Sequence, residues 1–444
     1  MPQRRSAFAG GSGSDSPLPP PNTAGKQKTR AMEEKAKLSG RLSFKISPAG
    51  ESGRRGIHPW IFVRIVFRSS NMAGTLCNLL WPVVPAAIAV RYSLPDHHLL
   101  IFALAYVSMV PCANSVGFAG QQLARKLPHV LGVLTEVLLG ATVEIIMFIV
   151  LLSKNEFYVI KAAIMGSILA TLLLCLGLCF FVGGLRRAEQ SFSETVSETG
   201  HGLLLLAGVT IAVPTIFASG LSNYGLTQED INNKSLSISR TLSILLIIAH
   251  VAFVYFQAHS HHGIYEAIFE YDEERDSDKL QKMEKSKLTL TECLLALAVA
   301  IALTTLIAII LVLQIPRVVE ASHVSDPFIG LILVPFVEKF AEHLTAIDEA
   351  WDDQMNFALS HVLGATLATS LFNAPLAVIV GWGLDKSMDL NFDIFNLAML
   401  ILSILTVGRF LQDQKSNYLE GFLMVILYIA IAVSSWYYPN PVER

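Results

Sequence analysis

Long apolar segments separated by short polar loops follow one another along most of the chain. A helix needs about 20 mostly apolar residues to cross a bilayer core. Several of the apolar segments contain Pro or Gly, which membrane helices tolerate where neighbouring helices satisfy the backbone. The pattern therefore predicts an all-α, polytopic membrane protein with about eleven spans. The expected spans are 72–90, 97–119, 129–153, 157–184, 200–219, 237–258, 290–314, 324–347, 355–382, 392–410 and 418–437.

Two long polar segments divide this pattern. Residues 1–60 are rich in Ser, Gly, Pro, Arg and Lys and lack the apolar stretch of a secretory signal, so we expect a disordered cytosolic tail. Residues 259–289 are predominantly acidic and predict a cytosolic linker. The remaining parts are 61–258, with one span plus a set of five, and 290–444, with a second set of five.

Composition and charge agree with a membrane protein. Only 16% of the residues are charged, whereas soluble domains carry about 25%. The net charge of −3 gives no basic field that would attract nucleic acid. Lys and Arg in short loops mark the cytosolic side, and the basic loop residues fall on one side if the N-terminus is cytosolic and the C-terminus lumenal. These residues are Arg54, Arg55, Arg64, Arg68, Arg125, Lys126, Arg186, Arg187, Arg409 and Lys415.

The two sets of five spans resemble each other. Each has a span with carboxylates at mid-depth, followed by a span with Gly and small hydroxyl residues. In the first set these residues are Glu136 and Glu144, then Gly166, Ser167 and Thr171. In the second set they are Glu338 and Glu342, then Gly364, Thr366 and Thr369. Because five is odd, the sets have opposite orientations, and such inverted repeats with broken helices are a transporter architecture.

The carboxylates predict the chemistry. An ionised carboxylate inside a membrane is costly, so it should face a cavity, a partner or a bound cation. Glu338 and Glu342 are four residues apart and share a helix face. A proton and a cation neutralise the same carboxylate and therefore compete for it. Oxygen ligands suit Ca²⁺ or alkali cations, so the pattern predicts an exchanger of cations for protons.

The segments around these carboxylates resemble the calcium/cation antiporter superfamily, in its cation/proton exchanger branch with fungal-type vacuolar members. "GATVEIIM" is similar to the first repeat of that family and places Glu144 at its ion-binding glutamate. "AEHLTA" is similar to the second repeat and places Glu342 and His343. Further similarity lies in "GSILATLLLCLGLCFFVGG", "PLAVIVGW" and "LLIIAHVAFVYFQAHSHH", and the resemblance covers most of residues 65–437.

The resemblance implies a fold, a function and a site. The fold is the sodium/calcium exchanger fold, with a first helix and two inverted five-helix repeats. The function is an antiport of cytosolic Ca²⁺ for H⁺ across the vacuolar or another endomembrane, with no cofactor and with cations, protons and the lipid bilayer as partners. Glu144 and Glu342 are the implied metal ligands. The candidate ion and proton site comprises Glu144, Glu342, His343, Glu338, Glu136, Lys339, Ser167, Thr171 and Thr366.

The chain also departs from the family pattern. Ala141 and Lys339 replace the repeat asparagines, Glu338 stands at a glycine position, and Thr171 and Ala368 replace Asn and Gln. The added positive charge favours a monovalent over a divalent cation by Coulomb repulsion, so a Na⁺ or K⁺/H⁺ antiporter is the alternative. In the opposing interpretation, the carboxylates form buried structural pairs. The spans contain no His-Glu-x-x-His or Gly-x-Ser-x-Gly motif, so an intramembrane enzyme is a remote alternative and we expect no enzymatic activity.

Overall fold

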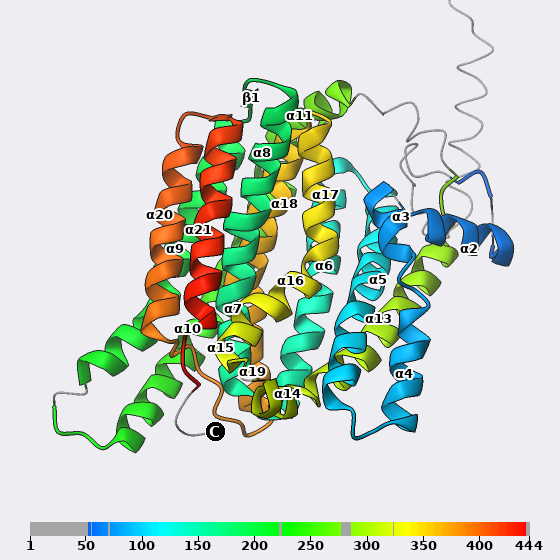
Figure 1. The fold of residues 1–444 in the computed structure, drawn as a ribbon. Coiled ribbons are helices and arrows are strands. Elements are labelled where there is room, and N and C mark those ends of the chain that lie inside the picture. The colour runs from blue at the N-terminus through cyan, green and yellow to red at the C-terminus, as the bar shows by residue number, and fades with distance from the viewer. Residues whose placement is uncertain are drawn as a thin grey trace, which may run out of the picture. The chain divides into compact units, whose positions relative to one another are not determined.

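In the computed structural model, the chain is almost entirely helical (Figure 1). The structure describes residues 52–54, 56–69, 72–221, 224–276, 286–322 and 324–440. Most of the predicted tail, residues 1–51, and part of the predicted linker, residues 277–285, lie outside the described residues.

The elements divide at the predicted linker. Those before it are α2 (Pro59–Arg68), α3 (Met72–Asn78), α4 (Val83–Ser93), α5 (His98–Ala124), α6 (His129–Ser153), α7 (Phe157–Leu169), the π-turn η2 (Ala170–Cys175), α8 (Leu176–Arg186), β1 (Gln190–Ser191), α9 (Glu194–Leu221), α10 (Gln228–Tyr255) and the π-turn η3 (Phe256–Ser260). Those that follow are α11 (His262–Arg275), α13 (Leu290–Val312), α14 (Ile315–Ser322), α15 (Asp326–Phe328), the π-turn η4 (Ile329–Leu333), α16 (Val334–Glu338), α17 (Phe340–Trp351), α18 (Met355–Ala368), the π-turn η5 (Thr369–Asn373), α19 (Ala374–Gly383), α20 (Ile394–Leu411), β2 (Lys415–Ser416) and α21 (Tyr418–Trp436).

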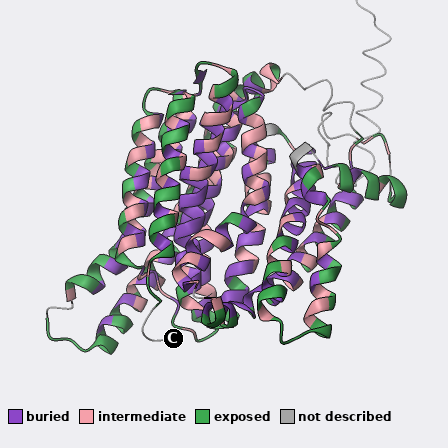
Figure 2. Cartoon of the chain, in the orientation of Figure 1, coloured by how far each residue is buried: buried purple, intermediate pink, exposed green. Residues whose placement is uncertain are grey.

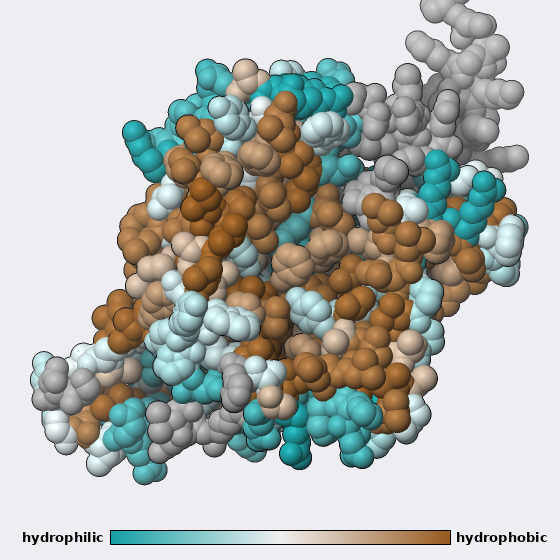
Figure 3. Space-filling view, in the orientation of Figure 1, coloured by the Kyte–Doolittle hydropathy of each residue, from teal (hydrophilic) through white to brown (hydrophobic). Residues whose placement is uncertain are grey.

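Ten helices in the described ranges are long and apolar enough to cross a membrane. They match ten of the eleven predicted spans, and the surface between the two polar ends of the bundle is largely apolar (Figure 3). The chain is therefore a multi-pass membrane protein. The ten helices are Gly74–Ser93, His98–Ala124, Val130–Ser153, Phe157–Arg186, Glu194–Leu221, Gln228–Ser260, Leu290–Ser322, Met355–Gly383, Ile394–Leu411 and Tyr418–Trp436.

The eleventh predicted span, 324–347, is a discontinuous helix. It consists of α15, η4, α16 and α17, which follow one another from one end of the bundle to the other (Figure 1). Pro335 lies in the first turn of α16 and has no N–H to donate. Lys339 separates α16 from α17, with φ −92° and ψ −3°, in the sparsely populated region next to the helical one. The segment crosses the bundle with a break at its charged residues.

Two long helical segments occupy the centre of the bundle. The fraction of buried residues in the apolar stretch is 67% for the α7–η2–α8 segment and 78% for the α18–η5–α19 segment (Figure 2). The same fraction is only 17% for the peripheral α10–η3 segment. The broken segment packs closely on α7, because a Cβ atom at Gly166 would lie 2.1 Å from the carbonyl oxygen of Leu331. Only glycine permits this approach of one backbone to the other.

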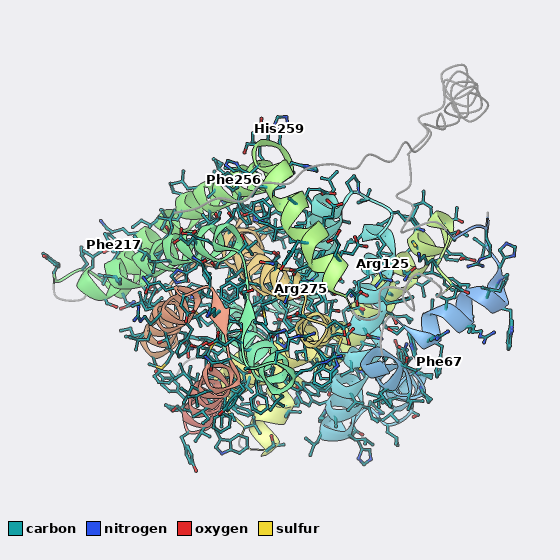
Figure 4. The ribbon with its side chains drawn as sticks, turned by 90° about the horizontal axis from the view of Figure 1, so that it is seen from above. Phe67, Arg125, Phe217, Phe256, His259 and Arg275 are labelled. Atoms are coloured by element: carbon teal, nitrogen blue, oxygen red, sulfur yellow. The ribbon has the colours of Figure 1, made fainter. Side chains whose placement is uncertain are left out.

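The loops with Lys and Arg meet at one end of the bundle. β1 and β2 pair antiparallel, with Gln190 opposite Ser416, and so join the loops after α8 and α20. In a third loop, Lys126 Nζ donates to the carbonyl oxygen of Leu288 at 2.8 Å. Figure 4 looks onto this end, where Arg275 at the end of α11 lies over the bundle. The prediction that these loops share one side is confirmed, and the assignment of that side to the cytosol stays a prediction.

The first part of the predicted linker is a helix that docks on this end. In α11, the buried carboxylate of Asp272 accepts hydrogen bonds from the backbone N–H groups of Asn356, at 2.7 Å, and Phe357, at 3.1 Å. Phe269 stacks on Phe357 with 4.8 Å between ring centroids. Burial raises the pKa of the Asp272 carboxyl, and the hydrogen bonds from Asn356 and Phe357 oppose that shift. Here the linker holds the start of α18.

Candidate ion site

Glu144 lies in α6 and is held by the second half of the chain. Its side chain is 1% exposed. Thr369 Oγ1 lies 2.9 Å from Oε1 and 2.8 Å from Oε2 of this carboxylate, and Asn373 Nδ2 donates to Oε2 at 2.6 Å. Both donors belong to η5. Glu144 is thus a buried carboxylate fixed by two side chains that lie more than 200 residues further along the chain.

Lys339 connects the two predicted metal ligands. Its Nζ atom lies 2.9 Å from Glu144 Oε2 and 3.2 Å from Glu342 Oε2, and its side chain is 1% exposed. A Cβ atom at Gly140 of α6 would lie 2.3 Å from Glu342 Oε1, so the glycine makes room for this carboxylate. The structure therefore brings together Glu144 and Glu342, one from each half, around a single ammonium group.

Several oxygen atoms of the cluster have no hydrogen-bond partner among the described residues. They include both carboxylate oxygens of Glu338, whose residue is 2% exposed, and Oε1 of Glu342. Oδ1 of Asn373 also has no hydrogen-bond partner among the described residues. Oxygens of this kind are the ligands that Ca²⁺ and alkali cations take in proteins. In the ranges that the structure describes, no three His, Cys, Asp or Glu side chains are grouped so that they could hold a metal ion.

The remaining predicted residues of the second spans divide into two groups. Thr171, in η2, lies with its Oγ1 atom 3.4 Å from Nε2 of His343. Ser167 is fully buried, and its hydroxyl has no hydrogen-bond partner among the described residues. Thr366 donates instead to the carbonyl oxygen of Val362 in its own helix, at 2.7 Å. Of these three hydroxyls, the structure thus brings only that of Thr171 into contact with another predicted site residue.

The two π-turns make reciprocal contacts. η2 in the first half contacts His343 of the second half, and η5 in the second half contacts Glu144 of the first. A π-turn shifts the side chains that follow it around the helix axis, and such turns are frequent at functional sites. This reciprocity is the arrangement expected of two inverted repeats.

Glu136 belongs to a neighbouring cluster. Its Oε2 atom lies 3.7 Å from Nε2 of His361, whose Nδ1 atom lies 2.7 Å from Oε2 of Glu349. A cavity of about 40 Å³ is lined by Glu136 and His361 as well as by Glu342 and His343. The site therefore has two parts that border one small cavity: the cluster around Lys339 and the pair of carboxylates around His361.

Comparison with known families decides what this arrangement belongs to. A family model described as "Sodium/calcium exchanger protein" matches residues 97–258 and 293–437. The chain belongs to this family. The two matched ranges contain every residue of the candidate site and, apart from residues 290–292, both predicted sets of five spans.

Similar proteins support the same assignment within this exchanger family. "Vacuolar cation/proton exchanger 2" of Arabidopsis thaliana is 31% identical over 366 residues, covering 82% of this chain and 81% of its own. "Vacuolar calcium ion transporter" of Schizosaccharomyces pombe is 31% identical over 340 residues, covering 77% and 80%. The solved structure of the "Ca2+/H+ antiporter protein" YfkE has a TM-score of 0.67 and 26% identity, covering 82% of this chain and 99% of its own. The predicted resemblance and exchanger fold are confirmed.

Sequence reasoning did not assign three residues that the structure places in this exchanger's site region. Asn373 is a buried polar residue in an apolar segment, and such residues need hydrogen-bond partners, which is a signal that could have found it. Thr369 was recognised in the repeat, but Thr366, three residues earlier, was chosen for the site. His361 is absent from the predicted site, and its pairing with Glu136 and Glu349 places it beside the cavity.

Proposed function

We propose that this exchanger is a secondary active antiporter that moves cytosolic Ca²⁺ into an acidic compartment in exchange for H⁺. Its relatives carry names of vacuolar cation/proton exchangers and calcium transporters. The observation that carries the proposal is the meeting of Glu144 and Glu342 at one position in the centre of the bundle, where an ammonium group now lies. Two carboxylates that share one cation are suited to share a transported one.

The proposed exchange follows from competition at these carboxylates. A cation bound between Glu144 and Glu342 neutralises both charges, and so does protonation of both. Protons that arrive from the acidic side therefore release the cation, and loss of protons on the other side allows a new cation to bind. Alternating exposure of the site, as in other transporters with inverted repeats, links the two steps. The exchange requires neither a cofactor nor an enzymatic step.

We also propose the vacuolar membrane as the location, with the end that carries β1, β2 and α11 facing the cytosol. The support is the gathering of basic loops at this end. Acidic residues are interspersed there, as in the ion pairs of Arg187 and Arg275 with Asp353. In this orientation the N-terminus is cytosolic and the C-terminus lumenal.

A monovalent cation is the second candidate substrate, and Lys339 is the observation that favours it. Its ammonium already contributes one positive charge between the two ligands, and repulsion from that charge is twice as strong for Ca²⁺ as for Na⁺. Substitution Lys339→Asn is expected to raise the rate of Ca²⁺ uptake relative to that of Na⁺. An unchanged ratio would remove Lys339 from the account of selectivity.

The function is tested by uptake into proteoliposomes with an acidic interior. Wild-type protein should accumulate ⁴⁵Ca²⁺ only while the proton gradient lasts, and a parallel assay with ²²Na⁺ tests the second candidate. Glu144→Gln and Glu342→Gln should each reduce uptake by about 100-fold or more, because each removes a charge that must bind the cation. Glu320→Gln, at a 64% exposed side chain in α14, is the matched control and should retain uptake. Undiminished exchange in both site variants would overturn the assignment.

A further inference from the structure

The position that a transported cation would take is occupied by a side chain of the protein. Lys339 Nζ lies within 3.2 Å of an oxygen of Glu144 and of Glu342. Both carboxylates belong to the proposed ligand set, so a cation cannot bind between them while the ammonium stays there. Cation binding therefore requires a second position for the ammonium group.

Glu338 supplies such a position. Its residue is 2% exposed, and neither of its carboxylate oxygens has a hydrogen-bond partner in the part of the chain that the structure describes. The carboxylate interacts electrostatically with Glu144, Lys339 and Glu342, so it lies in the same cluster. A buried carboxylate without a partner is costly, and an ammonium that moved to it would relieve that cost.

The break between α16 and α17 lies at Lys339, directly after Glu338. In a continuous helix, neighbouring residues point about 100° apart, since 3.6 residues complete a turn. Lys339 lies between the two helices, with φ −92° and ψ −3°. Its four-carbon side chain rotates about several bonds, so its ammonium is able to reach different partners from one fixed backbone position.

The charges of the cluster balance in this arrangement. Glu338 and Lys339 carry opposite charges and cancel when they pair. Glu144 and Glu342 then keep two negative charges for the entering cation, which matches the charge of Ca²⁺. The positive charge of Lys339 therefore excludes a divalent cation only if the ammonium stays between the two ligands.

We propose that Lys339 is a tethered counter-cation, which occupies the site when no cation is bound and moves to Glu338 when a cation binds. The inference rests on the proposed function, because it takes Glu144 and Glu342 as the ligands of the transported cation. Lys339 competes with the cation, and Glu338 weakens that competition without itself binding the cation. Glu338 and Lys339 thereby set the affinity of the site as a pair.

A double-mutant cycle tests this displacement. Equilibrium binding of ⁴⁵Ca²⁺ is measured in detergent for wild type, Glu338→Gln, Lys339→Met and the double variant. Glu338→Gln should weaken binding at least tenfold, because the ammonium then has no second partner. Lys339→Met should tighten binding at least tenfold, because the competitor is gone. The double variant should bind as tightly as Lys339→Met to within about threefold, since Glu338 matters only while Lys339 is present.

The opposite pattern overturns the inference. If Glu338 were a direct Ca²⁺ ligand, the Glu338→Gln substitution would weaken Ca²⁺ binding by the same factor in the Lys339→Met background as in wild type. The double variant would then bind more weakly than Lys339→Met by that factor. If Lys339→Met fails to fold, the double variant, which keeps the net charge of the cluster, is compared with Glu338→Gln alone. It must then bind at least tenfold more tightly, and equal binding by these two variants rejects the displacement.

The binding assay also separates this inference from the proposed function, because it uses no proton gradient. If Ca²⁺ binds in the expected pattern and wild type shows no proton-driven uptake, the proposed function fails and the displacement stands. If uptake is proton-driven and the double variant binds no more tightly than Glu338→Gln, the displacement alone fails. Absence of Ca²⁺ binding in all four proteins overturns both.

Discussion

The acidic helix of the first half and its counterpart in the second half are built differently. α6 runs without interruption from His129 to Ser153, and its Glu144 is fixed by Thr369 and Asn373. The counterpart is divided into α15, η4, α16 and α17, and its charged residues lie at the break. One half thus offers a fixed carboxylate, and the other offers an ammonium with more than one possible partner.

This difference shows how two related repeats share one site without equal roles. A helix that is hydrogen-bonded throughout holds a side chain in one position, which suits a ligand. A helix break frees backbone groups and widens the directions that neighbouring side chains take, which suits residues that exchange partners. The backbone of the broken segment is also bound from α5, where Tyr106 donates its hydroxyl to the carbonyl oxygen of Leu333 at 2.9 Å.

The largest expected effect concerns the packing on which the broken helix depends. A Cβ atom at Gly166 would lie 2.1 Å from the carbonyl oxygen and 2.7 Å from the Cα atom of Leu331, and backbone atoms of a packed helix cannot yield. Gly166→Ala should therefore destabilise the protein by about 3 kcal/mol or more, at the upper end of overpacking effects. Loss of monodisperse protein after detergent extraction, or a lower melting temperature, measures this effect.

The counterpart position in the second half provides the control. A Cβ atom at Gly364 would meet Cγ2 of Val137 at 3.2 Å, which is the end of a side chain that can adjust. Gly364→Ala should cost less than about 1 kcal/mol, because the higher helix propensity of Ala offsets the tighter contact. Equal melting temperatures for the two variants would show that the backbone contact of Gly166 is unimportant.

The second prediction compares the two π-turns. Thr369 donates, at less than 3 Å, to the Glu144 carboxylate that also contacts the ammonium of Lys339, whereas Thr171 lies 3.4 Å from an imidazole nitrogen. Hydrogen bonds to charged groups contribute about 1.5–3 kcal/mol and neutral ones about 1 kcal/mol. Thr369→Val should therefore weaken Ca²⁺ uptake at low Ca²⁺ concentration by about tenfold or more, and Thr171→Val by less than about fivefold.

The same substitution elsewhere in the membrane serves as a control for this pair. Thr305 in α13 donates to the carbonyl oxygen of Ile301 in its own helix, at 2.8 Å. Thr305→Val should leave initial uptake rates close to those of wild type. If Thr171→Val proved more damaging than Thr369→Val, the proposed division between a fixed and a mobile half would be reversed.

The fold was predictable because the lengths of the apolar segments and the repeat of their motifs can be recognised in the sequence. Ten of the eleven spans are helical segments long and apolar enough to cross a membrane, and their apolar length alone identifies them. The repeat and the family motifs placed Glu144 and Glu342 in one site, and the structure places Lys339 against both. The partners of Lys339 were not predictable, because in the sequence an ion pair between the adjacent residues Glu338 and Lys339 is as plausible as a pair with Glu144 or Glu342.

The hydrophobic pattern of the sequence did not predict the π-turns or the docking of the linker, for different reasons. The helices that contain η2 and η5 are buried nearly all around, so their apolar residues have no period from which an extra residue in a turn could be read. The linker does carry a signal. Tyr265, Phe269 and Asp272 are buried and spaced by four and three residues, which is one face of a helix, but the many acidic residues between them suggested a solvated segment.

The starts of α7 and α18 extend the comparison to the two ends of the bundle. Glu156, the residue before α7, makes no side-chain cap hydrogen bond. The first N–H groups of α18 are instead bound by Asp272 of the linker, which also accepts from Asn356 Nδ2 at 2.8 Å. At the start of α18 the second half therefore depends on the linker, whereas the Glu156 side chain does not cap α7.

The smallest predicted effect tests this dependence through pH. The folded state raises the pKa of Asp272 above its usual value, so the folded protein holds this proton more readily than the unfolded chain. The stability that Asp272 contributes is then fully present below the unfolded pKa, about 3.9, and is lost as pH rises through the folded pKa. Relative to Asp272→Asn, which costs on the order of 1 kcal/mol for one lost hydrogen bond, the stability advantage of the wild type should be largest at acidic pH.

Melting temperatures of both proteins, measured in detergent at low and neutral pH, should differ more at low pH. Glu270→Gln, at an exposed position of the same helix, should show no such trend, and a difference that grows toward neutral pH would contradict the role assigned to Asp272.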